Sequence, residues 1–399
     1  MLDAVLKKYV LDHEIAGVVL LVRKDGELVY DKAFGYADIE NKIPATKKTM
    51  FRLASMTKPI TAIAVMQLVE MGKIGLYQSV ETYLPVFKGQ KCCKNNKMAV
   101  QYQPDPQNPT GDGFREFLKQ EIPLVPAQRP ITVFDLLNHS SGLGMGQVGC
   151  TLAQSVALYG QTIGQRAEAY GKIPLDFQPG TASGYSSVVA FEVLAAIIEA
   201  VSGEDFEGYL QNHIFKPMGI TDITFRPNKE QQNRIPRLYQ YQQETGTLVD
   251  VTETDKHWER MNTLATDYCS ASTGLYGTME DYEKIAQMLL NRGMFHGVRI
   301  LKPETVDLMA GKGISHNSRS NPGVYWGLSV YVMEDPTYKN AGRTVGSYGW
   351  SGAFGTHFFI DPRNNLEMVL GVNRSNIGGA ASPVALAIEH AIKEDFALE

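Results

Sequence analysis

The alternation of apolar and polar residues predicts β-strands at both ends of the chain. Residues 16–38 alternate apolar and polar positions around a Lys-Asp-Gly-Glu turn, which is the pattern of a β-hairpin. Residues 324–333, 352–362 and 365–373 predict antiparallel strands, the last two joined at an Asp-Pro-Arg-Asn turn. We therefore expect strands from the two ends of the chain to share one domain.

Between and beside these strands, apolar residues recur at the spacing of α-helices. The ranges with this spacing are residues 1–14, 59–71, 278–293 and 382–395, together with much of 131–220. Thr278 is placed to cap the third of these helices. Helices thus dominate the middle of the chain.

This order of elements predicts an α/β (α+β) fold in which a mainly α domain is inserted into a discontinuous α/β domain. We expect residues 1–80 and 265–399 to form the discontinuous domain and residues 81–264 the inserted domain. The active site is then expected in the cleft between them. Within the insertion, residues 89–130 are rich in Lys, Asn, Gln, Gly and Pro, which predicts an irregular excursion.

Composition excludes several classes of partner. The 399-residue chain has a formal net charge of −5, so no global basic field favours nucleic acid or an anionic membrane surface. The most apolar long stretch, residues 188–201, is interrupted by Glu192 and Glu199 and is shorter than a membrane span of about 20 residues. Lys7 and Lys8 interrupt the N-terminal pattern, which favours a first helix over a secretory signal. A small-molecule substrate fits better, and nothing in the sequence indicates an oligomeric state.

The cysteines and histidines do not predict a metal site. Cys92, Cys93, Cys150 and Cys269 show no Cys-x-x-Cys spacing, and the eight histidines form no His-Glu-x-x-His motif. Free thiols in a reducing, cytoplasmic environment are the favoured interpretation, with a redox-sensitive Cys92–Cys93 pair as the alternative. We expect neither a metal nor an organic cofactor.

Ser55-Met56-Thr57-Lys58 is the only Ser-x-x-Lys sequence in the chain, and it stands at the start of a predicted helix. Residues three apart on a helix share a face, so the Lys58 amine can lie beside the Ser55 hydroxyl. A desolvated lysine can act as a proton acceptor, and the N–H groups of a first helical turn favour negative charge. One turn can thus supply a nucleophile, a base and an oxyanion donor. The structural alternative is a serine cap followed by a solvated lysine.

The sequence around this motif resembles the serine β-lactamase and penicillin-binding-protein superfamily. The resemblance is to its class C-like branch, which includes the family VIII carboxylesterases. It covers nearly the whole chain, departs mainly at residues 89–125 and 228–262, and keeps the motifs in the family order. The segments that carry it are residues 51–62, 72–87, 131–143, 177–187 and 349–355.

The resemblance implies two further motifs. Tyr185-Ser186-Ser187 matches the Tyr-x-Asn or Tyr-x-Ser motif, which makes Tyr185 a second proton-transfer group and places Ser187 at the substrate. A phenol titrates near 10, so a cationic Lys58 within hydrogen-bond reach is needed to make its phenolate accessible. A core tyrosine with a satisfied hydroxyl is the structural alternative.

The third motif is Trp350-Ser351-Gly352, where β-lactamases carry Lys-Thr-Gly. By resemblance, these three residues contact the substrate, and the Ala353 N–H completes an oxyanion hole with the N–H of Ser55. Small residues suit a strand against which an acyl group lies.

Two departures from the β-lactamase pattern indicate the substrate class. Trp350 replaces the lysine of the third motif, and Ser187 replaces the asparagine of the second. An apolar indole favours an uncharged ester, so we expect a carboxylesterase that works through a Ser55 acyl-enzyme. A β-lactamase, a D-amino-acid-specific peptidase or amidase, and an acyltransferase remain alternatives on the same scaffold. A non-catalytic ligand-binding relative is the more remote alternative.

Other polar residues have weaker claims to the chemistry. No Gly-x-Ser-x-Gly sequence occurs, so a nucleophile elbow is not predicted. His139 is interpreted as a hydrogen-bonded neighbour of the site and not as its base. Asn373 and Arg374 follow a predicted strand and are interpreted as a strand-end surface pair.

Overall fold

The structure is a computed structural model of the chain. It describes residues 1–94, 122–155, 162–255, 268–311, 322–335, 337, 341–379 and 381–398, and the statements below refer to these residues. The centre of the predicted excursion at residues 89–130 therefore lies outside the described residues. At its two ends, β5 (Lys91–Cys93) pairs with β6 (Leu124–Pro126) in an antiparallel ribbon.

A central antiparallel sheet joins the two ends of the chain. In spatial order its strands are β13 (Val324–Trp326), β14 (Tyr331–Met333), β15 (Tyr348–Ser351), β16 (His357–Asp361), β17 (Leu366–Val372), β1 (Gly17–Lys24), β2 (Glu27–Asp38) and β3 (Ile43–Pro44). The N-terminal hairpin β1–β2 pairs with the C-terminal strand β17 through β1, with Val18 opposite Val372 and Lys24 opposite Leu366. The predicted association of the two chain ends is confirmed.

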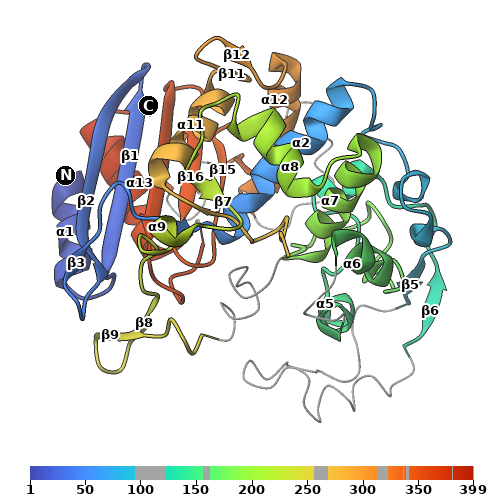
Figure 1. Cartoon of the computed structure of the whole chain (residues 1–399), viewed down its shortest axis with the longest axis horizontal. Helices are drawn as coiled ribbons and strands as arrows, with labels where there is room; N and C mark the ends of the chain where they lie inside the picture. The colour runs from blue at the N-terminus through green and yellow to red at the C-terminus, as the bar shows by residue number, and fades with distance from the viewer. Residues whose placement is uncertain are drawn as a thin grey trace.

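Both faces of this sheet are covered by helices. On the outer face lie α1 (Leu2–Leu11) and α13 (Pro383–Asp395), while α11 (Met279–Leu290) packs on the inner face against β16 and β17 (Figure 1). Neighbouring residues on one strand therefore belong to different cores. Phe358 packs with the inner core and Phe359 with the outer core, as the alternation of side chains along a strand requires.

A helical region lies beyond the inner face of the sheet. It is built around two buried helices. These are α2 (Thr57–Glu70) and α7 (Val189–Ser202), which contact each other and are apolar on most sides (Figure 1). The other helices are α4 (Val133–Leu137), α5 (Gln147–Ser155), α6 (Ile163–Tyr170), α8 (Phe206–Leu210), α9 (Lys229–Gln232) and α12 (Pro303–Met309). No helix among the described residues has the length and apolarity needed to cross a membrane.

Short strands connect the helical region to the sheet. They are β4 (Phe51–Arg52), β10 (Tyr276–Gly277) and β7 (Ile223–Thr224) in one sheet, β8 (Tyr239–Gln242) with β9 (Thr247–Asp250), and β11 (Met294–Phe295) with β12 (Val298–Arg299). The Tyr239 N–H donates to the Asn373 carbonyl at the end of β17. This bond ties part of the expected insertion to the sheet. The predicted domain boundary at residue 264 lies outside the described residues and stays a prediction.

One predicted strand is wrong. Residues 324–333 form two strands, β13 and β14, because the chain turns back at Gly327 and Ser329. Ser329 has a φ of 70°, in the left-handed region, and a Cβ on Gly327 would lie 2.2 Å from the Met309 carbonyl oxygen. The alternation of apolar and polar residues continues through this turn, so it hides the break in the sequence.

Candidate active site

Ser55 lies in a strained turn between β4 and α2. It is the central residue of a short 3-10 helix, Ala54–Met56, that runs directly into α2. Ala54 has a φ of 45°, which a residue with a side chain adopts only under constraint from its surroundings. Ser55 is partly exposed, whereas Ala54 and Met56 are buried. The turn therefore presents the hydroxyl of Ser55 and buries its neighbours.

Lys58 is a fully buried amine next to this hydroxyl. Its Nζ lies 3.2 Å from Ser55 Oγ, 2.7 Å from the Ser187 carbonyl oxygen and 3.0 Å from the Ser272 carbonyl oxygen. Burial lowers the pKa of Lys58 to about 7, although the nearby carboxylate of Glu192 acts in the opposite direction. A neutral amine has two N–H groups, and these can donate hydrogen bonds to the two carbonyl oxygens. Its lone pair is then directed at Ser55.

Tyr185 approaches Ser55 from the segment that precedes α7. Its hydroxyl donates to Ser55 Oγ over 2.8 Å. Burial raises the pKa of Tyr185 to about 12, while Ser55 and the Trp350 side chain act to lower it. Burial therefore opposes the phenolate form, and a role for Tyr185 as a proton acceptor stays a prediction. The structure brings the three residues of the expected trio together.

Aromatic side chains from three neighbouring strands surround Tyr185. Trp326 on β13 stacks parallel to the Tyr185 ring at 5.7 Å, and Trp350 on β15 lies 5.2 Å from that ring. Tyr331 on β14 contacts both tryptophans, at 4.0 and 4.7 Å. Trp350 is partly exposed and Trp326 is buried. These three rings thus form an apolar wall beside the hydroxyl.

The expected oxyanion donors belong to two segments that are held close together. β15 contacts the 3-10 helix of Ser55, and Ala353 packs in the same apolar cluster as Ala54. Among the hydrogen bonds of the described residues, none is donated by the N–H of Ser55 or of Ala353. The role of these two N–H groups as an oxyanion hole stays a prediction.

Gly352 and Thr356 fix this close approach. A Cβ on Gly352 would lie 2.3 Å from the Leu53 carbonyl oxygen and 2.2 Å from Thr356 Oγ1, so only glycine fits. The Thr356 hydroxyl donates to the Leu53 carbonyl over 3.1 Å, and the Gly352 N–H donates to the Thr356 carbonyl over 2.8 Å. The sequence gives no signal for Thr356, because its partner lies about 300 positions earlier in the chain.

Ser351 lies on the other side of the sheet from the trio. It is paired with His357 across β15 and β16, and its Oγ is 2.8 Å from His357 Nδ1. His357 Nε2 is 2.9 Å from the buried carboxylate of Glu389 on α13. Trp350, the preceding residue, faces the trio, so alternation along the strand turns Ser351 away. The structure therefore does not bring the Ser351 side chain to the place where substrate contact is expected.

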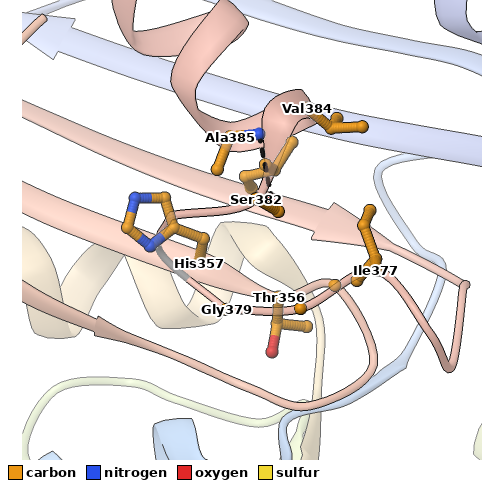
Figure 2. Close-up of a pocket in the computed structure, with 10 residues that line it drawn as sticks. Thr356, His357, Ile377, Gly379, Ser382, Val384 and Ala385 are labelled. Carbon is orange, nitrogen blue, oxygen red and sulfur yellow. Dashed lines mark hydrogen bonds between the residues drawn. The ribbon is translucent and has the colours of Figure 1, made fainter. Parts of the chain in front are cut away.

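A small pocket lies on this outer face, next to His357. It lies between the first residue of β16, the segment around Gly379 and the start of α13, where the Ser382 hydroxyl accepts from the Ala385 N–H (Figure 2). The residues that line it do not include Ser55, Lys58 or Tyr185. The pocket is thus separate from the candidate active site.

The other residues that the sequence suggested have structural roles, or contact the site only through a backbone group. The Ser187 side chain is exposed, and the residue's carbonyl, not its hydroxyl, contacts Lys58. His139 is buried and accepts from the Ser186 N–H, and burial lowers its pKa well below the usual value. The Asn373 amide bonds to the backbone of Gly17, and Arg374 donates to the backbone of Glu14. His139 matches its sequence interpretation. The prediction of a surface pair is wrong for Asn373, which is buried and holds the backbone of other segments.

Sequence reasoning missed the group that supports Lys58. Glu192 on α7 is fully buried, and its carboxylate accepts hydrogen bonds from the segment Tyr268–Ser272. In the sequence this residue is only an interruption in an apolar helix. Its single visible signal is a charge at a position where helical periodicity predicts burial. Among the described residues, no cluster of His, Cys, Asp or Glu side chains could hold a metal ion.

Comparisons with known proteins agree with this arrangement. The model of the beta-lactamase family matches residues 2–391. The chain belongs to the beta-lactamase family. The predicted superfamily is confirmed, and so is its β-lactamase and penicillin-binding-protein fold with a central antiparallel sheet.

Relatives within the family carry different activities. Esterase EstB of Burkholderia gladioli is 27% identical over 98% of this chain and 94% of its own length. A putative D-alanyl-D-alanine carboxypeptidase of Escherichia coli O157:H7 is 27% identical over 94% of this chain and 81% of its own length. The solved structure of EstCE1, a hydrolase with promiscuous acyltransferase activity, has a TM-score of 0.76 at 23% identity and covers 98% of this chain and 97% of EstCE1. The chain is therefore an enzyme of the β-lactamase-like serine hydrolases.

Proposed function

We propose that this enzyme is a carboxylesterase, similar to the family VIII enzymes, that hydrolyses small uncharged esters through an acyl-enzyme on Ser55. The observation that carries the proposal is the position of the Ser55 hydroxyl. It lies between an amine whose pKa is about 7 and a protonated phenol, 3.2 and 2.8 Å away. These are a base and an acid in the protonation states that ester cleavage needs near neutral pH.

Acylation begins with the neutral amine of Lys58. Ser55 Oγ attacks the ester carbonyl carbon and passes its proton to Lys58 Nζ, so the new ammonium has three acceptors around it. The carbonyl oxygen takes up negative charge beside the N–H groups of Ser55 and Ala353. Because these donors are fixed by Gly352 and Thr356, they need no rearrangement during the reaction.

Collapse of the tetrahedral intermediate breaks the bond to the alcohol oxygen, which needs a proton. The Tyr185 hydroxyl is placed to give it, and the proton that Lys58 holds restores the phenol. Water then attacks the acyl carbon with Lys58 as base, and the carboxylic acid leaves as Ser55 regains its proton. The cycle ends with the starting protonation states.

The apolar wall formed by Trp326, Tyr331 and Trp350 supports an ester substrate. Trp350 occupies the position of the third-motif lysine, so this site has no cation there to bind a carboxylate. An aromatic wall binds acyl or alcohol portions that are themselves apolar. EstB, an esterase that is similar over nearly the whole chain, supports the same substrate class.

The test compares wild type with Ser55→Ala on a short-chain p-nitrophenyl ester. Wild type should show a burst and steady turnover and should be labelled by a fluorophosphonate, whereas Ser55→Ala should show neither and keep its fold by circular dichroism. Turnover at the wild-type rate in Ser55→Ala would contradict the assignment of Ser55 as the nucleophile. Absence of label in wild type would favour a non-catalytic ligand-binding protein.

A parallel screen separates the alternatives on this scaffold. We expect turnover of esters to exceed that of nitrocefin and of D-alanyl-D-alanine peptides by about 100-fold or more, since the latter two carry a carboxylate. Faster cleavage of the peptide would favour the activity of the putative carboxypeptidase relative. Ester formation in the presence of a second alcohol would indicate acyl transfer.

A further inference from the structure

The buried carboxylate of Glu192 accepts hydrogen bonds from several groups of one distant segment of the chain. Its two oxygens accept from the hydroxyls of Tyr268, Ser270 and Ser272 and from the N–H groups of Ala271 and Ser272. The Ser270 hydroxyl lies 2.6 Å away, and the two N–H groups lie 3.3 Å away. A carboxylate that accepts so many bonds is saturated, which is how a buried charge is kept in a protein.

The segment that Glu192 holds is the one that receives Lys58. The Ser272 carbonyl accepts from Lys58 Nζ over 3.0 Å, and the Ala271 carbonyl accepts from the Thr61 hydroxyl over 2.7 Å. The Ser272 N–H is bonded to Glu192, and its carbonyl faces α2. The carboxylate, the segment and the catalytic turn therefore form one continuous chain of contacts.

We propose that Glu192 is a positioning residue for Lys58: it fixes the Ser272 carbonyl against the amine and balances the positive charge that Lys58 acquires when it takes the Ser55 proton. The inference rests on the proposed role of Lys58 as base. It assigns to α7 a part in the chemistry that the three sequence motifs do not contain.

The charge balance follows from the groups around Lys58. Two of its three acceptors are uncharged carbonyls and the third is the hydroxyl of Ser55, so none supplies a full negative charge. Tyr185 and His139 also face it, and both are neutral near pH 7. Glu192 is the carboxylate that raises the pKa of Lys58 against the effect of burial.

Other titratable groups surround Glu192 on its far side. Tyr268 donates to it, and the guanidinium of Arg166 on α6 lies 3.6 Å from the Tyr268 ring centre. Tyr170 on α6 is also near enough for Glu192 to raise the pKa of that phenol. These phenols remain protonated at neutral pH, so they add no charge beside Glu192.

The experiment follows the rate at which Ser55 reacts with a fluorophosphonate as a function of pH, together with kcat and KM for a p-nitrophenyl ester. In Glu192→Gln we expect the acid limb of both profiles to move about 0.5–1 pH unit lower, because the pKa of Lys58 falls without the negative charge. We expect kcat to fall about 10-fold and KM to change less than 2-fold. An acid limb at the wild-type position in folded Glu192→Gln would overturn the proposal.

Two further variants keep the test decisive. Glu367→Gln is the matched control, because Glu367 is equally buried but lies on β17 beside Glu283 and Arg23; its acid limb should stay in place. Glu192→Asp keeps the charge and shortens the side chain, so the limb should stay while kcat falls several-fold. If Glu192→Gln does not fold, an unchanged kcat in Glu192→Asp overturns the positioning role. Absence of label in wild type would instead refute the proposed function.

Discussion

Lys58 is buried and Tyr185 partly buried beside the same hydroxyl, yet burial moves their pKa values in opposite directions. The pKa of Lys58 falls to about 7, because an ammonium loses its hydration, and that of Tyr185 rises to about 12, because a phenolate would lose its hydration. Above about pH 7 both groups are therefore mainly neutral. One low-polarity environment produces a base and an acid without a formal charge on either.

Their partners explain why the roles are not interchangeable. Lys58 is held by two main-chain carbonyls, which accept its N–H groups and leave a lone pair for Ser55. Tyr185 lies against the stacked ring of Trp326 and the tilted ring of Trp350, which offer no acceptor for its proton. Each environment thus favours one direction of proton transfer.

The largest effect is expected on replacing the base. Lys58→Met keeps the length and apolar packing of the side chain but removes the lone pair, so kcat/KM for p-nitrophenyl esters should fall about 10⁴-fold. Thermal unfolding provides the control. Because burial of the ammonium costs free energy, the variant should unfold at a temperature no lower than wild type. Activity within 10-fold of wild type would show that Lys58 is not the base.

A smaller and substrate-dependent effect is expected for the acid. Tyr185→Phe keeps the ring against Trp326 and removes only the hydroxyl, so cleavage of an alkyl ester should fall about 10³-fold. For a p-nitrophenyl ester, whose leaving group departs without a proton, the fall should be about 10-fold. Steady-state kinetics on the two esters measures the difference. Equal losses on both would mean that Tyr185 acts on Ser55 as a base.

The third prediction concerns pH. Since Lys58 must be unprotonated to accept a proton, kcat/KM of wild type should fall about 10-fold for each pH unit below about 7 and be level above it. Tyr185 should not limit the rate below pH 10, because its pKa is about 12. A pH-rate profile from 5 to 10 tests this. A rate that stays level down to pH 5 would contradict the role of Lys58 in this limb.

The smallest effect is expected on the outer face of β15. Ser351→Ala removes the hydroxyl that bonds to His357 and touches neither proton-transfer group, so kcat/KM should change less than about 3-fold. A loss of about 1 kcal/mol of stability is expected, as for other buried hydrogen bonds. Ester kinetics and thermal unfolding measure the two effects. A 100-fold loss of activity with unchanged stability would return Ser351 to the substrate contacts.

The order of elements and the Ser55–Lys58 pair are readable from the sequence because both are local. A spacing of three residues on a helix fixes the pair, and alternation predicts the hairpin at residues 16–38. α2, α7, α11 and α13 all coincide with ranges of helical spacing. In these cases the physical constraint acts between close neighbours in the chain.

The remaining features depend on contacts between distant segments. Glu192 and Ser272 are 80 residues apart, and the Thr356 hydroxyl reaches a carbonyl 303 residues earlier. The side of the sheet on which Ser351 lies depends on the strand register, which a shift of one residue would invert. A matching motif identifies residues at a site but does not show which of their atoms act there. Ser187 is an example, because its carbonyl and not its hydroxyl contacts Lys58.

The use of main-chain carbonyls to hold Lys58 has an evolutionary consequence. A backbone oxygen is present whichever side chain the residue carries, so positions 187 and 272 can change identity without disturbing the amine. This explains how a serine can stand where the β-lactamase motif has an asparagine. Side chains at these two positions can therefore change and alter the rim of the reaction centre, while the carbonyls that hold the amine stay in place.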